Sequence, residues 1–205
     1  MRPENPAEAG PQMPAALSGD EFAMPATGLK AEAAPRYDVF QTALGWVAIV
    51  ATGEGVRRTS LPEPDPQIAL ASAGVTEDTA VHDPDAVAGA RSLIARYCEG
   101  QTADLSAIRL DVRDRPEFFQ RAWQACRSIP AGETRSYAWL AAQAGNSRAA
   151  RGAGQAMARN PVPLLVPCHR VVGSGGGLHG FGGSVGLPMK QRLLELESRP
   201  ASSAA

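Results

Sequence analysis

The sequence predicts an α+β fold, in which a small N-terminal α/β part precedes a mostly helical C-terminal part. Residues 37–61 contain apolar and β-branched runs separated by glycine turns, a texture typical of strands. Residues 114–158 contain three helical patterns, each with its own start signal. With 205 residues, the chain can form one mid-sized domain or two small ones.

Three strands are expected first. Residues 37–42 and 45–51 are joined by a turn near Leu44-Gly45, and a third strand over residues 55–61 follows a second glycine turn. Residues 62–66 are then a polar loop stiffened by prolines.

One helix and a fourth strand complete the N-terminal part. Asp83-Pro84-Asp85 offers a helix start, and residues 86–97 have helical apolar spacing that ends near Gly100. Residues 108–112 alternate as a strand does. No residue in this part indicates chemistry.

An amphipathic helix opens the C-terminal part. It starts at residues 114–117, where proline and acidic charge suit a first turn, and Pro130-Ala131-Gly132 ends it. Its apolar face consists of Phe118, Phe119, Ala122, Trp123, Cys126 and Ile129. Cys126 is therefore expected in the core.

Two short helices follow, over residues 137–143 and 148–158. Ser136 can cap the first, and Gly145-Asn146-Ser147 makes the turn between them, as in a helix-turn-helix. The second helix consists largely of alanine and glycine. Such a helix can pack closely against another helix or approach a nucleic acid backbone.

Four segments are expected along the chain. Residues 1–35, rich in Pro, Ala, Glu and Gly, and residues 199–205 are predicted to be disordered tails. Residues 36–112 form a scaffold domain, and residues 113–198 form the functional domain. The sequence predicts neither a secretory signal nor a membrane span.

The net charge of −1 conceals an asymmetry between the two parts. Residues 1–110 hold 8 Lys and Arg against 15 Asp and Glu, whereas residues 111–197 hold 11 against 6. No acidic residue occurs from Thr134 to Leu194. An acid-free basic segment in a near-neutral protein indicates a polyanionic partner, with a merely basic surface as the alternative. This basic segment contains the two short helices, which favours DNA as the polyanionic partner.

The three cysteines, Cys98, Cys126 and Cys168, are odd in number and far apart. This spacing predicts a reducing, cytoplasmic compartment and argues against a disulfide scaffold. The three histidines show no zinc-ligand spacing, so no metal site is expected. Cys98 and His82 are interpreted as structural or surface residues.

One stretch carries candidate chemistry, namely residues 160–172 with the sequence NPVPLLVPCHRVV. Its prolines fix φ and remove backbone donors, so the approach to Cys168 is rigid and non-helical. A stiffly held, buried thiol beside His169 has the ingredients of an activated nucleophile. The alternative is a small buried hydrophobe whose neighbour points the other way.

Pro167-Cys168-His169-Arg170, preceded by Asn160-Pro161-Val162-Pro163, resembles the active-site signature of the O6-alkylguanine-DNA alkyltransferases, also called methylated-DNA–protein-cysteine methyltransferases. Residues 136–141 and 148–160 stand upstream in the matching order. The resemblance extends over residues 118–197 and, more weakly, back to about Tyr37. It implies direct-reversal DNA repair and an RNase H-like N-terminal domain. Some relatives carry a structural zinc there, whose ligands this chain lacks.

The resemblance implies that Cys168 takes the alkyl group from O6 of guanine by in-line displacement, once per molecule. His169 matches the base that acts on the thiol through a water, and Glu197 matches the carboxylate that orients it. Asn160 matches the residue that braces the active-site turn, and Tyr137 matches the phenol that donates towards N3 of the departing guanine. No cofactor is needed, because the protein is the acceptor. O4-alkylthymine is left open as a second substrate.

The resemblance also implies a monomer that binds alkylated double-stranded DNA through the minor groove and flips the damaged nucleotide out. Arg151 matches the finger that fills the vacated stack. Asn146 and Ser174 match positions that touch the DNA backbone, and Ala149 and Ala150 are expected on the DNA-facing side of the second helix.

Two features concern the segment after the site. Phe181 stands where several relatives have tyrosine, and the loop over residues 180–187 is longer than in compact relatives. This departure leaves open which alkyl groups are accepted. The glycines at 173 and 175–177 predict either a mobile segment or a hairpin turn.

Two other functional classes are alternatives to the alkyl acceptor. A silent lesion-binding protein of the alkyltransferase-like kind flips the base without accepting the group, but those relatives lack the cysteine. An ordinary cysteine hydrolase needs an oxyanion hole, and that function does not explain the basic helix pair. The sequence therefore favours the alkyl acceptor.

Overall fold

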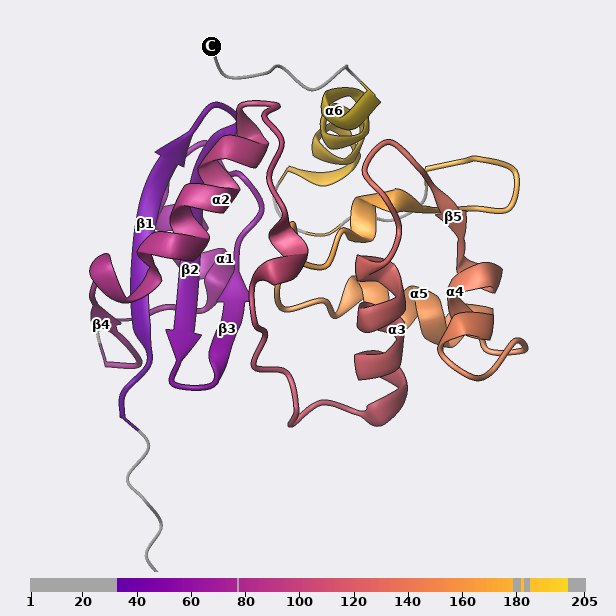
Figure 1. Cartoon of the computed structure of the whole chain (residues 1–205), viewed down its shortest axis with the longest axis horizontal. Coiled ribbons are helices and arrows are strands. Elements are labelled where there is room, and N and C mark those ends of the chain that lie inside the picture. Colours follow the sequence, from indigo (N-terminus) through magenta and orange to yellow (C-terminus); the bar gives the residue numbers. More distant parts are fainter. Residues whose placement is uncertain (1–32, 77, 179–181, 183–184, 199–205) are drawn as a thin grey trace, which may run out of the picture. The chain divides into compact units, whose positions relative to one another are not determined.

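A computed structural model of the chain describes residues 33–76, 78–178, 182 and 185–198. The N-terminal part contains a four-stranded sheet in the order β3-β2-β1-β4 (Figure 1). β1 (Arg36–Thr42), β2 (Gly45–Thr52) and β3 (Gly55–Thr59) pair antiparallel, and the short β4 (Val81–His82) pairs with β1 in parallel. The three strands predicted from residues 37–61 are confirmed, although the third ends at Thr59 and β4 was not predicted.

Helices cover both faces of this sheet. Val47 and Ile49 of β2 belong to the main core, against which α2 (Ala88–Cys98) packs after a 3-10 turn over Asp85–Val87. Ala48 and Val50 belong to a second cluster with α1 (Pro66–Ala73). Figure 1 shows α2 in front of the sheet and α1 behind it. A strand covered on both faces shows a continuous apolar run, as β2 does.

The interpretation of residues 62–66 as a loop alone missed α1. Asp65 caps this helix by accepting the backbone N–H groups of Gln67 and Ile68, and Pro66 occupies the first turn. Gly74 ends the helix with a left-handed φ of 67°. An aspartate before a proline is a helix start signal, but the surrounding run of prolines concealed it.

The predicted strand over residues 108–112 is wrong. Only Leu110 pairs, in one isolated parallel bridge to Val56 of β3. The N–H of Val56 donates to the Arg109 carbonyl and the N–H of Asp111 donates to the Val56 carbonyl, each at 2.8 Å. Further along β3, the N–H of Thr59 donates to the Pro161 carbonyl at 3.0 Å instead. The end of β3 therefore pairs with the segment that leads to Cys168.

The C-terminal part follows the predicted order. α3 (Glu117–Arg127) and α4 (Tyr137–Gln143) are confirmed, as is the helix predicted over residues 86–97. α5 (Ala150–Ala158) begins two residues later than expected, because residues 148 and 149 still belong to the turn. The last helix, α6, extends over Gly186–Ser198.

One hydrophobic core includes residues from both parts of the chain. Trp123 of α3 is 1% exposed and donates its indole N–H to the Ala156 carbonyl of α5 at 2.8 Å. Cys126 is buried, as expected, and Cys98, interpreted as a structural or surface residue, is buried as well. The division into two domains near residue 112 stays a prediction.

Gly55→Ala tests the contact between β3 and residues 109–110. Gly55 has a φ of 140°, and an added Cβ would lie 2.6 Å from the Arg109 carbonyl oxygen. The expected loss in free energy of unfolding is more than about 1 kcal/mol, measured by urea denaturation.

Gly53→Ala is the matched control in the same turn, because nothing lies within 4 Å of a Cβ there. It is expected to change stability by less than about 0.5 kcal/mol. Equal effects of the two substitutions would contradict the close approach at Gly55.

Candidate active site

The segment leading to Cys168 is a tight turn held from within. Val166 donates its N–H to the Val162 carbonyl at 2.9 Å, and Leu164 has a left-handed φ of 70°. The Asn160 amide donates to the Val166 carbonyl at 2.9 Å, and its side-chain oxygen accepts the Val162 N–H at 3.0 Å. A non-glycine residue at positive φ persists only where its surroundings determine it. Asn160 therefore spans the turn and fixes its two ends.

The N-terminal sheet also holds this turn. The Thr59 hydroxyl of β3 donates to the Pro163 carbonyl at 2.6 Å, beside the bond from the Thr59 N–H to Pro161. The N-terminal part thus contributes directly to the position of the site, although no residue in it indicated chemistry in the sequence.

Cys168 begins the 3-10 turn Cys168–Arg170 and is 9% exposed. Burial raises the pKa of its thiol, while a hydrogen bond from the Asn160 side chain and the charge of Lys190 oppose the rise. A thiol with a raised pKa is protonated at neutral pH, so it needs a base to become a nucleophile.

The carboxylate of Glu197, in α6, accepts hydrogen bonds from distant segments of the chain, and the side chain is only 2% exposed. His169 Nε2 lies 2.8 Å from Oε1, and Arg170 donates from Nη2 to Oε1 at 2.8 Å and from Nε to Oε2 at 2.9 Å. The Gly132 N–H donates to Oε2 at 3.1 Å. Burial alone would raise the pKa of Glu197, but the hydrogen bonds and charges of His169 and Arg170 hold it well below its usual range. The carboxylate is therefore ionised.

An ionised Glu197 determines the tautomer of His169, because Nε2 must carry the proton that it donates. Burial lowers the pKa of His169, and Glu197 opposes this while Arg170 adds to it. His169 Nδ1 is buried and has no hydrogen-bond partner within the described part of the chain. The imidazole is thus neutral, with a lone pair available at Nδ1.

Sequence reasoning missed two residues of this site. The Tyr97 hydroxyl, from α2, donates to Glu197 Oε1 at 2.7 Å and lies 3.2 Å from His169 Nε2. Lys190 of α6 is fully buried and donates from Nζ to the Val171 carbonyl at 2.7 Å. Burial lowers the pKa of Lys190, and a negative charge on Cys168 opposes that shift.

The sequence carried one usable signal for these two residues. Lys190 stands between Met189 and Leu193, which both face the core, so a lysine at this position of the last helix is unusual. Tyr97 ends an ordinary amphipathic helix, and no local pattern distinguishes it from a core tyrosine.

Tyr137 lies beside the site because two short strands pair there. β5 (Arg135–Ser136) runs parallel to β6 (Val171–Val172), which directly follows the Cys168 turn. The Ser136 hydroxyl then caps α4 and sets Tyr137 at its first position. Burial raises the pKa of Tyr137, and a negative charge on Cys168 raises it further. The phenol is therefore neutral and within electrostatic reach of the thiol.

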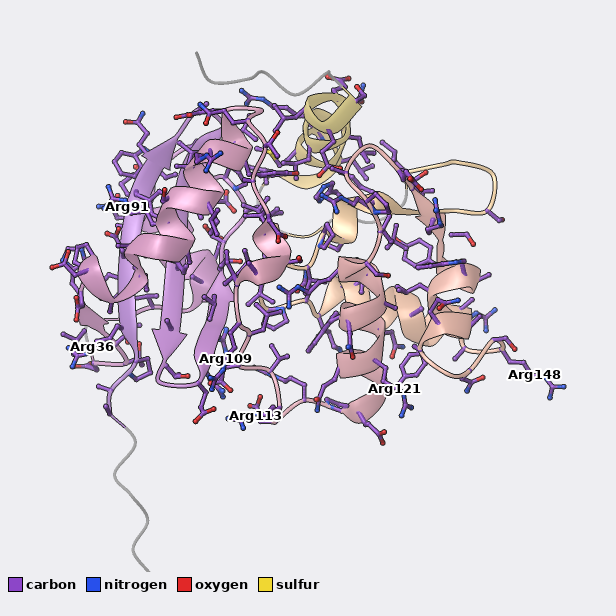
Figure 2. The ribbon with its side chains drawn as sticks, in the orientation of Figure 1. Arg36, Arg91, Arg109, Arg113, Arg121 and Arg148 are labelled. Atoms are coloured by element: carbon purple, nitrogen blue, oxygen red, sulfur yellow. The ribbon has the colours of Figure 1, made fainter. Side chains whose placement is uncertain are left out.

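The turn between α4 and α5 presents arginines to solvent. Asn146 lies in this turn, where its side-chain oxygen accepts the Arg148 N–H at 3.2 Å. Figure 2 shows Arg148 projecting from the tip of the turn. Ala149 and Ala150 are half-buried and Arg151 is exposed. Among the described residues, no acidic side chain forms a salt bridge with either arginine.

The small residues of α5 serve the packing of its inner face. Ala153 and Ala156 are fully buried, and a Cβ added at Gly152 would lie 3.3 Å from the Phe118 ring of α3. Close helix packing, one of the two expected alternatives, therefore holds for this face. The outer face remains available to a partner.

Ser174 is exposed in a separate turn after β6, which the Gly173 N–H closes by donating to the Gly177 carbonyl at 2.9 Å. Of the two alternatives for this glycine-rich stretch, the structure shows the turn. Phe181 and half of the loop over residues 180–187 lie outside the described residues.

The described residues contain no group of three or more His, Cys, Asp or Glu side chains placed to hold a metal ion. Within the same residues, no helix has the length and apolar character needed to cross a membrane.

Together the fold and the site define a mixed α+β protein with a buried cysteine, a histidine–glutamate pair behind it and two short helices beside it. Residues 117–199 match the family model described as 6-O-methylguanine DNA methyltransferase, DNA binding domain. The methylated-DNA–protein-cysteine methyltransferase of Mycolicibacterium paratuberculosis is 48% identical over 122 residues, which are 58% of this chain and 72% of the relative.

Two further comparisons cover more of the chain. The protein of the same name from Methanosarcina acetivorans is 32% identical over 164 residues, which are 78% of this chain and 97% of the relative. The crystal structure of Mycobacterium tuberculosis OGT in complex with DNA is similar with a TM-score of 0.65 and 33% identity, over 80% of this chain and 92% of that one. The chain belongs to the methylated-DNA–protein-cysteine methyltransferase family.

Glu197→Gln is expected to lower the free energy of unfolding at pH 7 by about 3 kcal/mol, because it leaves Arg170 buried without its counter-charge. In the unchanged protein the pKa of Glu197 is depressed by folding, so its stabilisation is present above its usual pKa and is lost as pH falls. Between pH 7 and pH 3, the free energy of unfolding measured by denaturation should therefore decline less steeply for the variant than for the unchanged protein.

Glu195→Gln, an exposed position of the same helix, is the control and should shift stability by less than about 0.5 kcal/mol. A similar cost for both substitutions would mean that Glu197 does not hold the network together.

Proposed function

We propose that this chain repairs DNA by direct reversal, through irreversible, stoichiometric transfer of the alkyl group from O6-alkylguanine to Cys168. The observation that carries the proposal is the buried Cys168 thiol in one site with a neutral His169 and a neutral Tyr137. Membership of the methyltransferase family supports the same reaction. O4-alkylthymine is a second candidate substrate for the same chemistry.

The first step is proton transfer from the thiol. His169 Nδ1 is the available lone pair, and a water molecule carries the Cys168 proton to it. The resulting imidazolium keeps its Nε2–H directed at Glu197, which stabilises the new charge. Lys190, whose charge lowers the pKa of the thiol, also favours the thiolate.

The second step is in-line displacement. The sulfur forms a bond to the alkyl carbon while the bond from that carbon to O6 breaks, and the electron pair passes to the guanine. Tyr137 donates towards N3 of the departing base, and the proton taken from the thiol ends on the guanine. A thioether is a stable product, so each molecule reacts once and no cofactor takes part.

The helix pair supports binding to double-stranded DNA. We assign α4 and α5 as a helix-turn-helix that enters the minor groove, with Arg151 filling the stack after the nucleotide flips out. Ala149 and Ala150 allow close approach, and Asn146 and Ser174 contact the backbone. Flipping costs a few kcal/mol, which these contacts offset. The related structure in complex with DNA supports this assignment.

Finer features of fold and setting belong to the same proposal. The sheet order β3-β2-β1-β4, with three antiparallel strands and a parallel edge strand, supports an RNase H-like N-terminal domain. Free Cys98, Cys126 and Cys168 suit the reducing cytoplasm. A one-shot acceptor acts as a monomer.

Mixing the protein with a duplex that carries one O6-methylguanine is expected to add a single methyl group to the Cys168 peptide. The gain should saturate at one per protein, be absent in Cys168→Ala and persist in Cys98→Ala. Intact and peptide mass spectrometry measures it. Tight binding without any mass gain would instead indicate a silent lesion-binding protein.

Tyr97→Phe tests whether the Tyr97 hydroxyl positions the base. Loss of this donor leaves more negative charge on Glu197, which raises the pKa of His169. The single-turnover rate should fall roughly three- to tenfold, as for the loss of one hydrogen bond. In the pH profile of this rate, the acid limb should move to higher pH. A slower rate with an unchanged pH profile would assign Tyr97 a packing role only.

A further inference from the structure

A cavity of about 420 Å³ borders the turn that precedes Cys168. It is enclosed by the loop after α2, over residues 100–106, and by the end of α3 with the residues that follow, over 127–131. Leu164 and Pro167 of the turn form one wall, and the end of α6 forms another. A cavity of this size, with apolar walls and a few polar groups, is typical of a site for a small molecule.

The cavity lies apart from the surfaces assigned to DNA and to the departing base. None of the described residues with a proposed contact to DNA or to the guanine lines it, and neither does Cys168. Tyr97, Arg170 and the buried carboxylate of Glu197 do line it. A ligand in the cavity would therefore contact the network behind the catalytic base without blocking the DNA.

Arg127, the last residue of α3, brings a positive charge to the cavity without a carboxylate beside it. Its Nη2 donates to the carbonyls of Leu105, Ser106 and Ile108, at 3.2, 2.7 and 2.8 Å. Within the described chain Arg127 forms no salt bridge, and Asp104 acts on it only through longer-range charge. Nε is buried without a hydrogen-bond partner, whereas Nη1 is accessible and forms no hydrogen bond with these residues. An anionic group at Nη1 would supply the missing counter-charge.

The other charged groups of the cavity are already engaged. Arg170 and Glu197 pair with each other at 2.8 Å. Asp104 is exposed, and its Oδ1 accepts both the N–H and the hydroxyl of Ser106. Water and salt screen an exposed carboxylate more than a partly buried guanidinium, and burial lowers the pKa of Arg127. Arg127 is therefore the group that gains most from the charge of an anionic ligand.

We propose that this cavity is a regulatory site for a small organic anion with an apolar body, with Arg127 as the residue that binds the anionic group. The apolar body packs against Leu105 and Leu164 of the cavity wall. Contact with Arg170 and Glu197 changes the electrostatic surroundings of the catalytic base, so occupancy of the cavity changes the rate of alkyl transfer. The binding is independent of the proposed function, whereas its effect on the rate rests on that function.

Binding is tested with two fluorescent probes that share an aromatic body, the anion anilinonaphthalene sulfonate and the uncharged phenylnaphthylamine. Both emit more strongly in apolar surroundings, so titration of the protein gives their affinities. Arg127→Gln removes the positive charge and should weaken sulfonate binding roughly fivefold, as for one partly exposed charge pair, with less than about a twofold change for the uncharged probe. Arg127→Lys keeps the charge and should retain part of the affinity for the sulfonate.

Two further substitutions leave the guanidinium in place, so the test does not depend on the folding of Arg127→Gln. Ala131→Trp, at an exposed position of the cavity wall, should fill part of the cavity and weaken the binding of both probes. Asp104→Asn should strengthen sulfonate binding, because it removes a like charge near the ligand. Arg121→Gln is the matched control, since Arg121 is an arginine of the same helix that lies outside the cavity and pairs with Glu117 (Figure 2). It should change neither affinity.

The regulatory role is tested by the single-turnover rate on a duplex with one O6-methylguanine at saturating sulfonate. The rate should change at least about twofold in the unchanged protein but not in Ala131→Trp, and the duplex should not displace the probe. Displacement by the duplex, or affinities that Arg127→Gln and Ala131→Trp leave unchanged, would overturn the site. An unchanged rate would overturn the regulation. Failure of methyl transfer without the probe would overturn the alkyl transfer itself and leave the binding result in place.

Discussion

The ionised carboxylate of Glu197 is the interaction on which the rest of the site depends. Burying a charge is costly unless donors surround it, and here they come from α2, from the residues after Cys168 and from the Gly132 backbone. Arg170 further ties this cluster to the segment that follows α3 by donating to the Ile129 carbonyl at 2.6 Å. Because the donors belong to distant segments, satisfying one carboxylate joins the last helix to both parts of the chain.

The same interaction decides the chemistry that His169 can perform. Glu197 retains the proton on Nε2, and burial with Arg170 keeps the ring neutral, so the basic lone pair is at Nδ1. Arg170 has two effects. It stabilises the carboxylate of Glu197, and its positive charge reduces the stabilisation that this carboxylate gives to the imidazolium of His169. The base is therefore strong enough to accept a thiol proton and weak enough to stay unprotonated beforehand.

The parts of the molecule that could be predicted from sequence are those whose signals are local. Prolines around Cys168 indicated a rigid, non-helical approach to it, and the Ser136 cap and glycine turn located α4 and α5 to within two residues. Tyr97 could not be found in this way, because its role depends on a contact with Glu197, which is one hundred residues away. The strand expected over residues 108–112 failed for a related reason: of the β3 residues only Val56 bonds to the backbone of this segment, while Thr59 further along β3 bonds to Pro161.

The N-terminal part therefore does more than support the helical part. Through Thr59 it holds the turn before Cys168, and through Tyr97 it reaches the histidine–glutamate pair. Thr59 and Tyr97 are buried and bonded to the site, so substitution there disturbs the chemistry itself.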